Sequence, residues 1–152
     1  MSFICTAMFL SRLFKKKQPQ TTPTLVLANL PALNAWGIFF QGNGITLYSR
    51  SAATVPGMAS DFVYLKSYPE VFELERKLFA EWLATSSTGV YLQQWDDKKE
   101  NRTLVYVSFT DPALTVIKTG ITTANWASGY EDGKPVIIFK YDSGINESYV
   151  IG

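Results

Sequence analysis

Apolar and polar residues alternate along several short stretches of the chain, which is typical of antiparallel β-strands with one buried and one wet face. The clearest case is residues 36–41 and 45–50, which flank Gly42, Asn43 and Gly44. Asn-Gly tolerates positive φ at both centres of a tight turn, and such turns match the twist of paired strands. This stretch therefore predicts a β-hairpin.

Further strands are predicted from short runs rich in β-branched and aromatic residues. Residues 90–95 and 103–109 predict a second hairpin joined by a polar turn at 96–101, and the apolar run 135–141 predicts a central strand. Residues 51–60 and 129–134 are interpreted as loops. The remaining predicted strands are short: 25–27, 62–65, 114–117 and 148–151.

One long amphipathic helix is predicted over residues 68–84. Ser67 followed by Glu70 fits a capping box, and Pro69 suits a first helical turn. Because strands dominate and hairpins imply antiparallel pairing, the expected class is α+β: a mainly antiparallel sheet of about five to eight strands with this helix packed on one face. The predicted apolar stripe of the helix comprises Val71, Leu74, Leu78 and Trp82.

The N-terminal 23 residues are predicted to be an arm and linker, and residues 24–152 a single domain. On a helical wheel, residues 1–17 place basic and apolar side chains on opposite faces, which suits an anionic membrane surface. The alternatives are a helix that docks on the domain and a frayed tail. The apolar run is far too short to span a bilayer. The candidate membrane-surface residues are Phe3, Leu10, Arg12, Phe14, Lys15, Lys16 and Lys17.

The charge is unevenly distributed along the 152 residues. Residues 1–17 carry four bases and no acid, and the remainder carries ten bases against thirteen acids, for a net charge of +1. Because nucleic-acid binders usually show a basic stripe on the fold itself, no nucleic-acid partner is expected. The single cysteine, Cys5, excludes an intrachain disulfide and fits a reducing compartment, or equally one in which no bridge is needed.

Much of catalytic chemistry is excluded by composition. The chain contains no histidine, which removes the commonest general base and metal ligand and every Ser-His relay. The acidic pairs are better explained by turns and by a helix N-terminus than by catalysis. We therefore expect no metal, no cofactor and no catalytic residue. These pairs are Glu70 with Glu73, Asp96 with Asp97, and Glu131 with Asp132.

Two predicted loops combine aromatic and acidic residues, a combination in which the ring anchors a partner and the charge steers it. Either tryptophan of these loops is also compatible with an inward position that caps the core. The candidate partner-binding residues are Trp95, Asp96 and Asp97 in one loop, and Trp126, Tyr130, Glu131 and Asp132 in the other.

These observations favour a non-enzymatic protein-binding or inhibitory module in the cytoplasm. Its size and pattern are compatible with bacterial immunity or anti-defence proteins, which is an analogy of size and class and not of motif. One alternative is a membrane-surface accessory protein held at the inner membrane face by residues 1–17. The other is a histidine-free enzyme that uses carboxylates.

Overall fold

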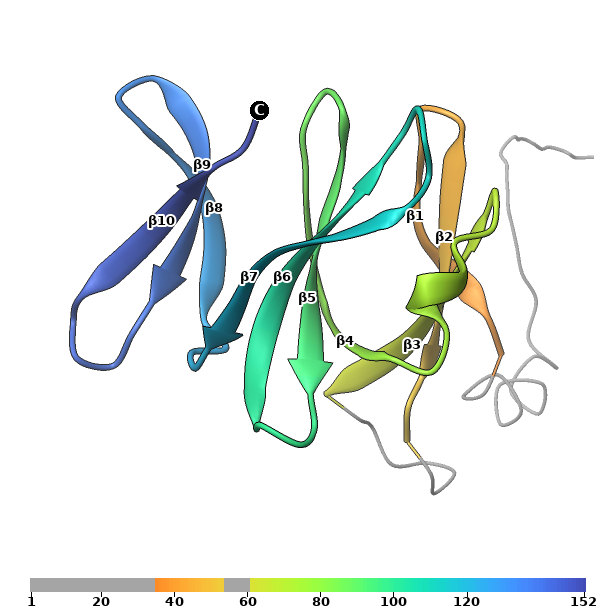
Figure 1. The fold of residues 1–152 in the computed structure, drawn as a ribbon, viewed down its shortest axis with the longest axis horizontal. Coiled ribbons are helices and arrows are strands. Elements are labelled where there is room, and N and C mark those ends of the chain that lie inside the picture. The colour runs from red at the N-terminus through yellow and green to blue at the C-terminus, as the bar shows by residue number, and fades with distance from the viewer. Residues whose placement is uncertain (1–34, 54–60) are drawn as a thin grey trace, which may run out of the picture. The chain divides into compact units, whose positions relative to one another are not determined.

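The computed structural model describes residues 35–53 and 61–152, and within them Trp36–Gly152 form one unit. This part of the chain folds into ten strands and one 3-10 turn, with no α-helix (Figure 1). The predicted strand at 25–27, the arm and linker boundary at residue 23 and all seven membrane-surface candidates lie outside the described residues. The strands are β1 (Gly37–Gly42), β2 (Ile45–Ser51), β3 (Phe62–Tyr68), β4 (Leu78–Thr85), β5 (Gly89–Asp96), β6 (Asn101–Ser108), β7 (Leu114–Ile121), β8 (Trp126–Glu131), β9 (Lys134–Lys140) and β10 (Asn146–Val150).

The predicted helix at 68–84 and the α+β class are wrong. The segment instead forms the single 3-10 turn η1 (Phe72–Leu74) and then strand β4. The Ser67 hydroxyl accepts the Val71 N–H at 2.9 Å, but the N-cap of η1 is Val71 itself, which makes no side-chain cap hydrogen bond. No helix continues past Leu74: Glu75 is extended (φ −65°, ψ 143°), and Arg76 then adopts the left-handed φ of +64°.

The sequence of strand β4 resembles that of a helix because the strand is covered on both faces. Phe79 and Leu83 face one core, while Trp82 and Ala84 face the other. Apolar residues therefore occupy both registers, and the two-residue period of a strand disappears. An irregularity in the pairing with β5, between Phe79 and Leu83, disturbs the pattern further.

Strands β1–β7 form one antiparallel sheet in chain order, and β10, β9 and β8 form a second. The predicted first hairpin is confirmed: Asn43 and Gly44 have φ of +52° and +83°, as a mirror-image tight turn requires. Strand β8 includes residues 129–131, half of the stretch 129–134 that was interpreted as a loop. Its hairpin with β9 turns at Asp132 and Gly133 (φ +51° and +76°), so the Asp-Gly signal was present in the sequence.

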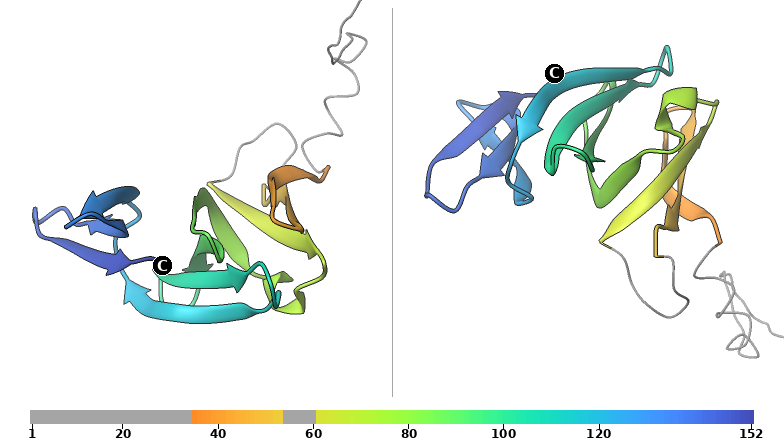
Figure 2. Two further views of the ribbon diagram at one scale, coloured as in Figure 1. Left: turned by 90° about the horizontal axis from the view of Figure 1, so that it is seen from above. Right: turned by 60° about the horizontal axis from the view of Figure 1, so that its bottom comes forward.

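The seven-stranded sheet curls strongly on itself (Figure 2). Phe40 of β1 and Phe109, just beyond β6, stack with ring centroids 6.0 Å apart. Five strand steps separate β1 from β6, which is about 24 Å in a flat sheet. The curl brings these strands together around an enclosed core. This first core comprises Ile45, Leu47, Val63, Leu65, Val71, Leu74, Phe79, Val90, Leu92, Val105 and Val107.

The three-stranded sheet packs against the opposite face of the large sheet, around β4–β7. Strands β5 and β6 are consequently buried on both faces, and Gly89, Val90, Tyr91, Leu92 and Gln93 are buried in succession. Burial on two faces makes β5 and β6 the least replaceable part of the fold. This second core comprises Ala84, Tyr91, Leu104, Ile121, Trp126, Ile137, Phe139 and Ile151.

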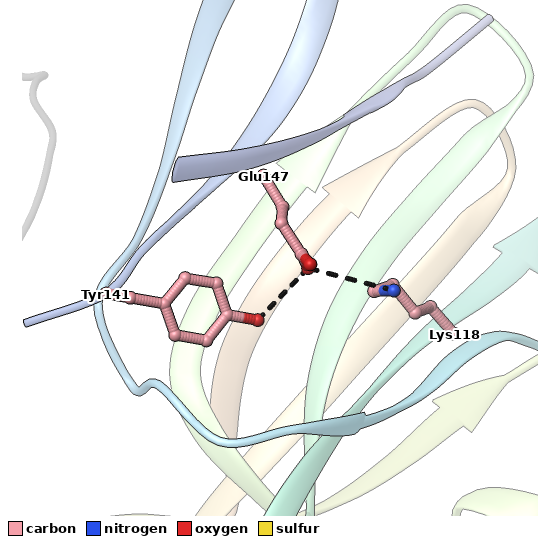
Figure 3. A network of polar contacts seen from close by, with 3 residues as sticks. All are labelled: Lys118, Tyr141 and Glu147. Atoms are coloured by element: carbon pink, nitrogen blue, oxygen red, sulfur yellow. Dashed lines mark hydrogen bonds and ion pairs between the residues drawn. The ribbon is translucent and has the colours of Figure 1, made fainter. Parts of the chain in front are cut away.

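A small polar network also connects the two sheets at the surface (Figure 3). The Glu147 carboxylate of β10 accepts a hydrogen bond from the Tyr141 hydroxyl at 3.1 Å and lies 3.8 Å from the Lys118 ammonium of β7. Burial, followed by this hydrogen bond and the Glu147 charge, raises the pKa of Tyr141. The ion pair links β10 to β7, and because both side chains are about half-exposed it contributes at most about 1 kcal/mol.

Candidate functional site

The most distinctive surface lies on the outer face of β2 and β3, opposite the enclosed core. Strand pairing sets Tyr48 of β2 against Lys66 of β3, and Arg50 against Tyr64. Because alternate residues of a strand point to the same side, these four side chains share one face while Leu47 and Leu65 enter the core. Cations and aromatic rings therefore alternate in both directions across the sheet.

Trp36 contacts both cations of this face. The Arg50 guanidinium carbon lies 5.1 Å from the centroid of the Trp36 ring, and the Lys66 ammonium lies 4.5 Å from it. Arg50 also lies 5.4 Å from the Tyr64 ring, and Lys66 lies 6.0 Å from the Tyr48 ring. Each contact is within the range of a cation–π interaction, about 0.5–1 kcal/mol at an exposed site. These cation–π contacts hold the long side chains of Arg50 and Lys66 in place.

Trp36, Arg50, Tyr64, Leu65, Lys66, Glu75 and Arg76 together line an open groove of about 450 Å³, which we name the cation–aromatic groove. Three of its residues are cations and one is an acid. Among the described residues, none of the three cations forms an ion pair. The groove thus presents an excess of uncompensated positive charge beside aromatic surface.

One donor atom of the Arg50 guanidinium lacks a hydrogen-bond acceptor. Its Nε atom is buried and has no hydrogen-bond partner within the described part of the chain. A buried donor without an acceptor costs about 1–3 kcal/mol, and a ligand in the open groove does not reach a buried atom. A carboxylate or phosphate oxygen in the groove would instead meet the remaining guanidinium N–H groups, whose geometry it matches.

A second cation–aromatic cluster lies where β3 begins, beside the end of β5 (Figure 1). Phe62 and Trp95 stack with ring centroids 5.3 Å apart and planes 21° from parallel. The Arg102 guanidinium lies 4.9 Å from the Trp95 ring and 5.9 Å from the Phe62 ring. Burial lowers the pKa of Arg102, and the nearby Asp61 charge opposes this shift. We name Phe62, Trp95 and Arg102 the Arg102 cluster.

The first predicted binding loop contributes one residue to this surface. Trp95 is partly buried in the Arg102 cluster, and Asp97 is exposed at the β5–β6 turn. Asp96 has a structural task, because its Oδ1 accepts the N–H groups of Lys98 and Lys99 at 3.1 and 3.2 Å. Only Asp97 of this predicted set is exposed, while Trp95 is partly buried.

The second predicted binding loop is divided between core and surface. Trp126 is 6% exposed, and its indole N–H donates to the Thr123 carbonyl at 2.7 Å, so it lies in the second core. Tyr130 is 77% exposed. Glu131 accepts a hydrogen bond from the Ser148 hydroxyl at 2.7 Å, and Asp132 forms the β8–β9 turn. The structure does not bring this loop to the β5–β6 turn, which lies at the other end of the view in Figure 1.

The cation–aromatic groove was not predicted from the sequence, although part of its pattern is present there. Tyr48 and Arg50 alternate with the apolar residues Ile45 and Leu47, which places them on the opposite, wet face of a strand. Their neighbours Tyr64 and Lys66 repeat the same aromatic-x-base spacing on β3. Recognising that these pairs oppose each other requires the β2–β3 register, which the intervening residues 51–61 do not reveal.

Residues 35–53 and 61–152 contain no group of three or more His, Cys, Asp or Glu residues able to hold a metal ion. Within the same residues, no helix has the length and apolar character needed to cross a membrane.

No protein-family model, no curated protein and no solved structure matches the chain. The function is therefore inferred from the geometry of the groove.

Proposed function

We propose that the protein is a non-enzymatic binding module that recognises an acidic segment of another protein in the cation–aromatic groove. The observation that supports this most directly is the placement of Arg50, Lys66 and Arg76 around one groove without ion-pair partners among the described residues. Charge complementarity of this kind accelerates association and selects partners. Trp36 and Tyr64 add the aromatic surface that anchors binding sites.

A protein segment fits this surface better than a nucleic acid. Residues 36–152 carry ten bases against thirteen acids, so a long polyanion meets a domain of net negative charge. Acids also lie within the basic surface, with Glu75 in the groove and Asp61 beside Arg102. A short acidic peptide interacts mainly with the positive charge close to it. Its backbone N–H groups can also donate hydrogen bonds to the carboxylates of Glu75 and Asp61.

The proposal can be tested with a defined probe, a ten-residue peptide containing six glutamates, measured by isothermal titration calorimetry with the full chain. We expect binding that weakens with added salt, and at least a tenfold loss in Arg50→Glu or Lys66→Glu. The matched control is Lys134→Glu, a reversal of an exposed lysine on β9, which should change the affinity less than twofold. The same peptide with glutamine in place of glutamate should not bind.

Two results would overturn the proposal. If Lys134→Glu weakens binding as much as Arg50→Glu, the peptide responds to overall charge and not to the groove. If an oligothymidylate of equal charge binds more tightly than the peptide, and loses affinity in the same groove variants, the surface is a nucleic-acid site.

A further inference from the structure

The Arg102 cluster and the cation–aromatic groove lie on the same face of one strand. Phe62 and Tyr64 are two residues apart on β3, so their side chains point to the same side of the sheet. Arg50 contacts Tyr64 at 5.4 Å, and Arg102 contacts Phe62 at 5.9 Å. The outer face of β3 thus carries Arg102 beside Phe62, at the start of the strand, and Arg50 beside Tyr64, near its middle.

Arg102 shares the unusual state of Arg50. The Nε atom of each arginine is buried without a hydrogen-bond partner within the described residues. Neither guanidinium makes an ion pair there, and their other nitrogens are not among the buried unpaired atoms. Each arginine is half-buried and lies against aromatic rings, which hold its planar donor group in one orientation for an incoming carboxylate.

From these contacts we infer that the partner segment is bipartite: it carries two acidic positions, one bound at Arg50 and Lys66 in the groove and the other at Arg102. This inference rests on the proposed function and specifies the spacing of the ligand. Two residues on one strand face are about 7 Å apart, so the 5.4 Å and 5.9 Å contacts to the Tyr64 and Phe62 rings place the two guanidinium groups at most on the order of 20 Å apart. An extended peptide covers this distance in about five residues.

The test compares three peptides of equal length and charge, each with two glutamate pairs separated by zero, five or twelve neutral residues. The full chain should bind the five-residue spacing at least fivefold more tightly than either other spacing, because only this peptide engages both sites at once. Arg102→Gln should remove that preference while leaving the affinity for the adjacent pairs within twofold of the unmodified chain.

Arg102→Lys provides a second variant in which charge and packing volume are largely retained. It should preserve part of the preference, since a lysine keeps the charge but lacks the planar stacking group. Lys134→Gln is the matched control and should keep the full preference. Thermal unfolding of each variant checks that the fold is intact, and if Arg102→Gln unfolds early, the reduced preference expected of Arg102→Lys becomes the test.

The inference fails if affinity is independent of spacing, or if Arg102→Gln weakens all three peptides equally. In either case the proposed function survives, provided that Arg50→Glu still abolishes binding of the adjacent pairs. If none of the three peptides binds, the proposed function fails as well. The two ideas therefore have separate outcomes.

Discussion

Gly89 occupies a position at the start of β5 where the structure leaves no room for a side chain. A Cβ atom built there would overlap the Val107 carbonyl oxygen of the paired strand and lie 2.5 Å from the Tyr106 ring. The carbonyl belongs to the β5–β6 ladder, and Gly89 is paired with Ser108. Neither neighbour can move without a cost, so Gly89→Ala is expected to be strongly destabilising.

The size of the effect follows from what must move. Overpacking costs about 1–3 kcal/mol. Displacing Tyr106 also disturbs its 4.9 Å ring contact with Tyr91, worth about 0.5–1.5 kcal/mol, and its 2.8 Å hydrogen bond to the Thr88 hydroxyl, worth about 1 kcal/mol. The lower entropy of an unfolded alanine offsets about 0.4–1 kcal/mol. The expected net loss is about 2–4 kcal/mol.

Urea unfolding followed by tryptophan fluorescence measures this loss as a lower midpoint at unchanged slope. With a slope near 2 kcal/mol/M, the midpoint should fall by about 1–2 M. Gly37→Ala is the matched control, because no atom lies within 4 Å of its built Cβ, and it should stay within about 0.5 kcal/mol of the unmodified chain. If Gly89→Ala is as stable as Gly37→Ala, the described β5–β6 packing is incorrect.

Three further predictions concern the second sheet and its contacts. Trp126→Phe loses the 2.7 Å indole hydrogen bond to Thr123 and should cost about 1–2 kcal/mol in the same urea assay, and no loss would contradict the buried position. Gly133→Ala places a side chain at φ +76° and should cost about 1 kcal/mol, which thermal unfolding can detect as a shift of a few degrees. Burial raises the folded pKa of both Tyr91 and Tyr141. The unfolded chain therefore releases these phenolic protons first, and stability should fall as pH rises above about 10. Tyr91→Phe with Tyr141→Phe should flatten the curve there, and an unchanged slope would contradict the assignment.

Local sequence signals predicted the hairpins because their information is contained within a few residues. Asn43-Gly44 specifies a turn type, and the flanking alternation specifies which face is wet. Strand β4 could not be predicted in this way, because its apolar residues serve two cores that come together only in the folded chain. Without that knowledge, the helical period was the simpler interpretation of the same residues.

The candidate site was less predictable than the fold, for a related reason. Tyr48, Arg50, Tyr64 and Lys66 come from two strands, and Trp36 approaches from outside β1. Their alternation exists only once the strand register is set. The predicted loops were instead chosen by composition within a single stretch of chain, which separated Trp95 from Arg102 and treated Trp126 as a surface candidate.

The central claim is that the cation–aromatic groove, and not another surface, receives the acidic partner. Its most direct test is a heteronuclear NMR titration of the ¹⁵N-labelled full chain with the six-glutamate peptide. We expect the largest chemical-shift changes at the Trp36 indole and at the backbone amides of Arg50, Tyr64 and Lys66. Changes confined to the β8–β9 turn around Tyr130, or spread evenly over the exposed lysines, would contradict it.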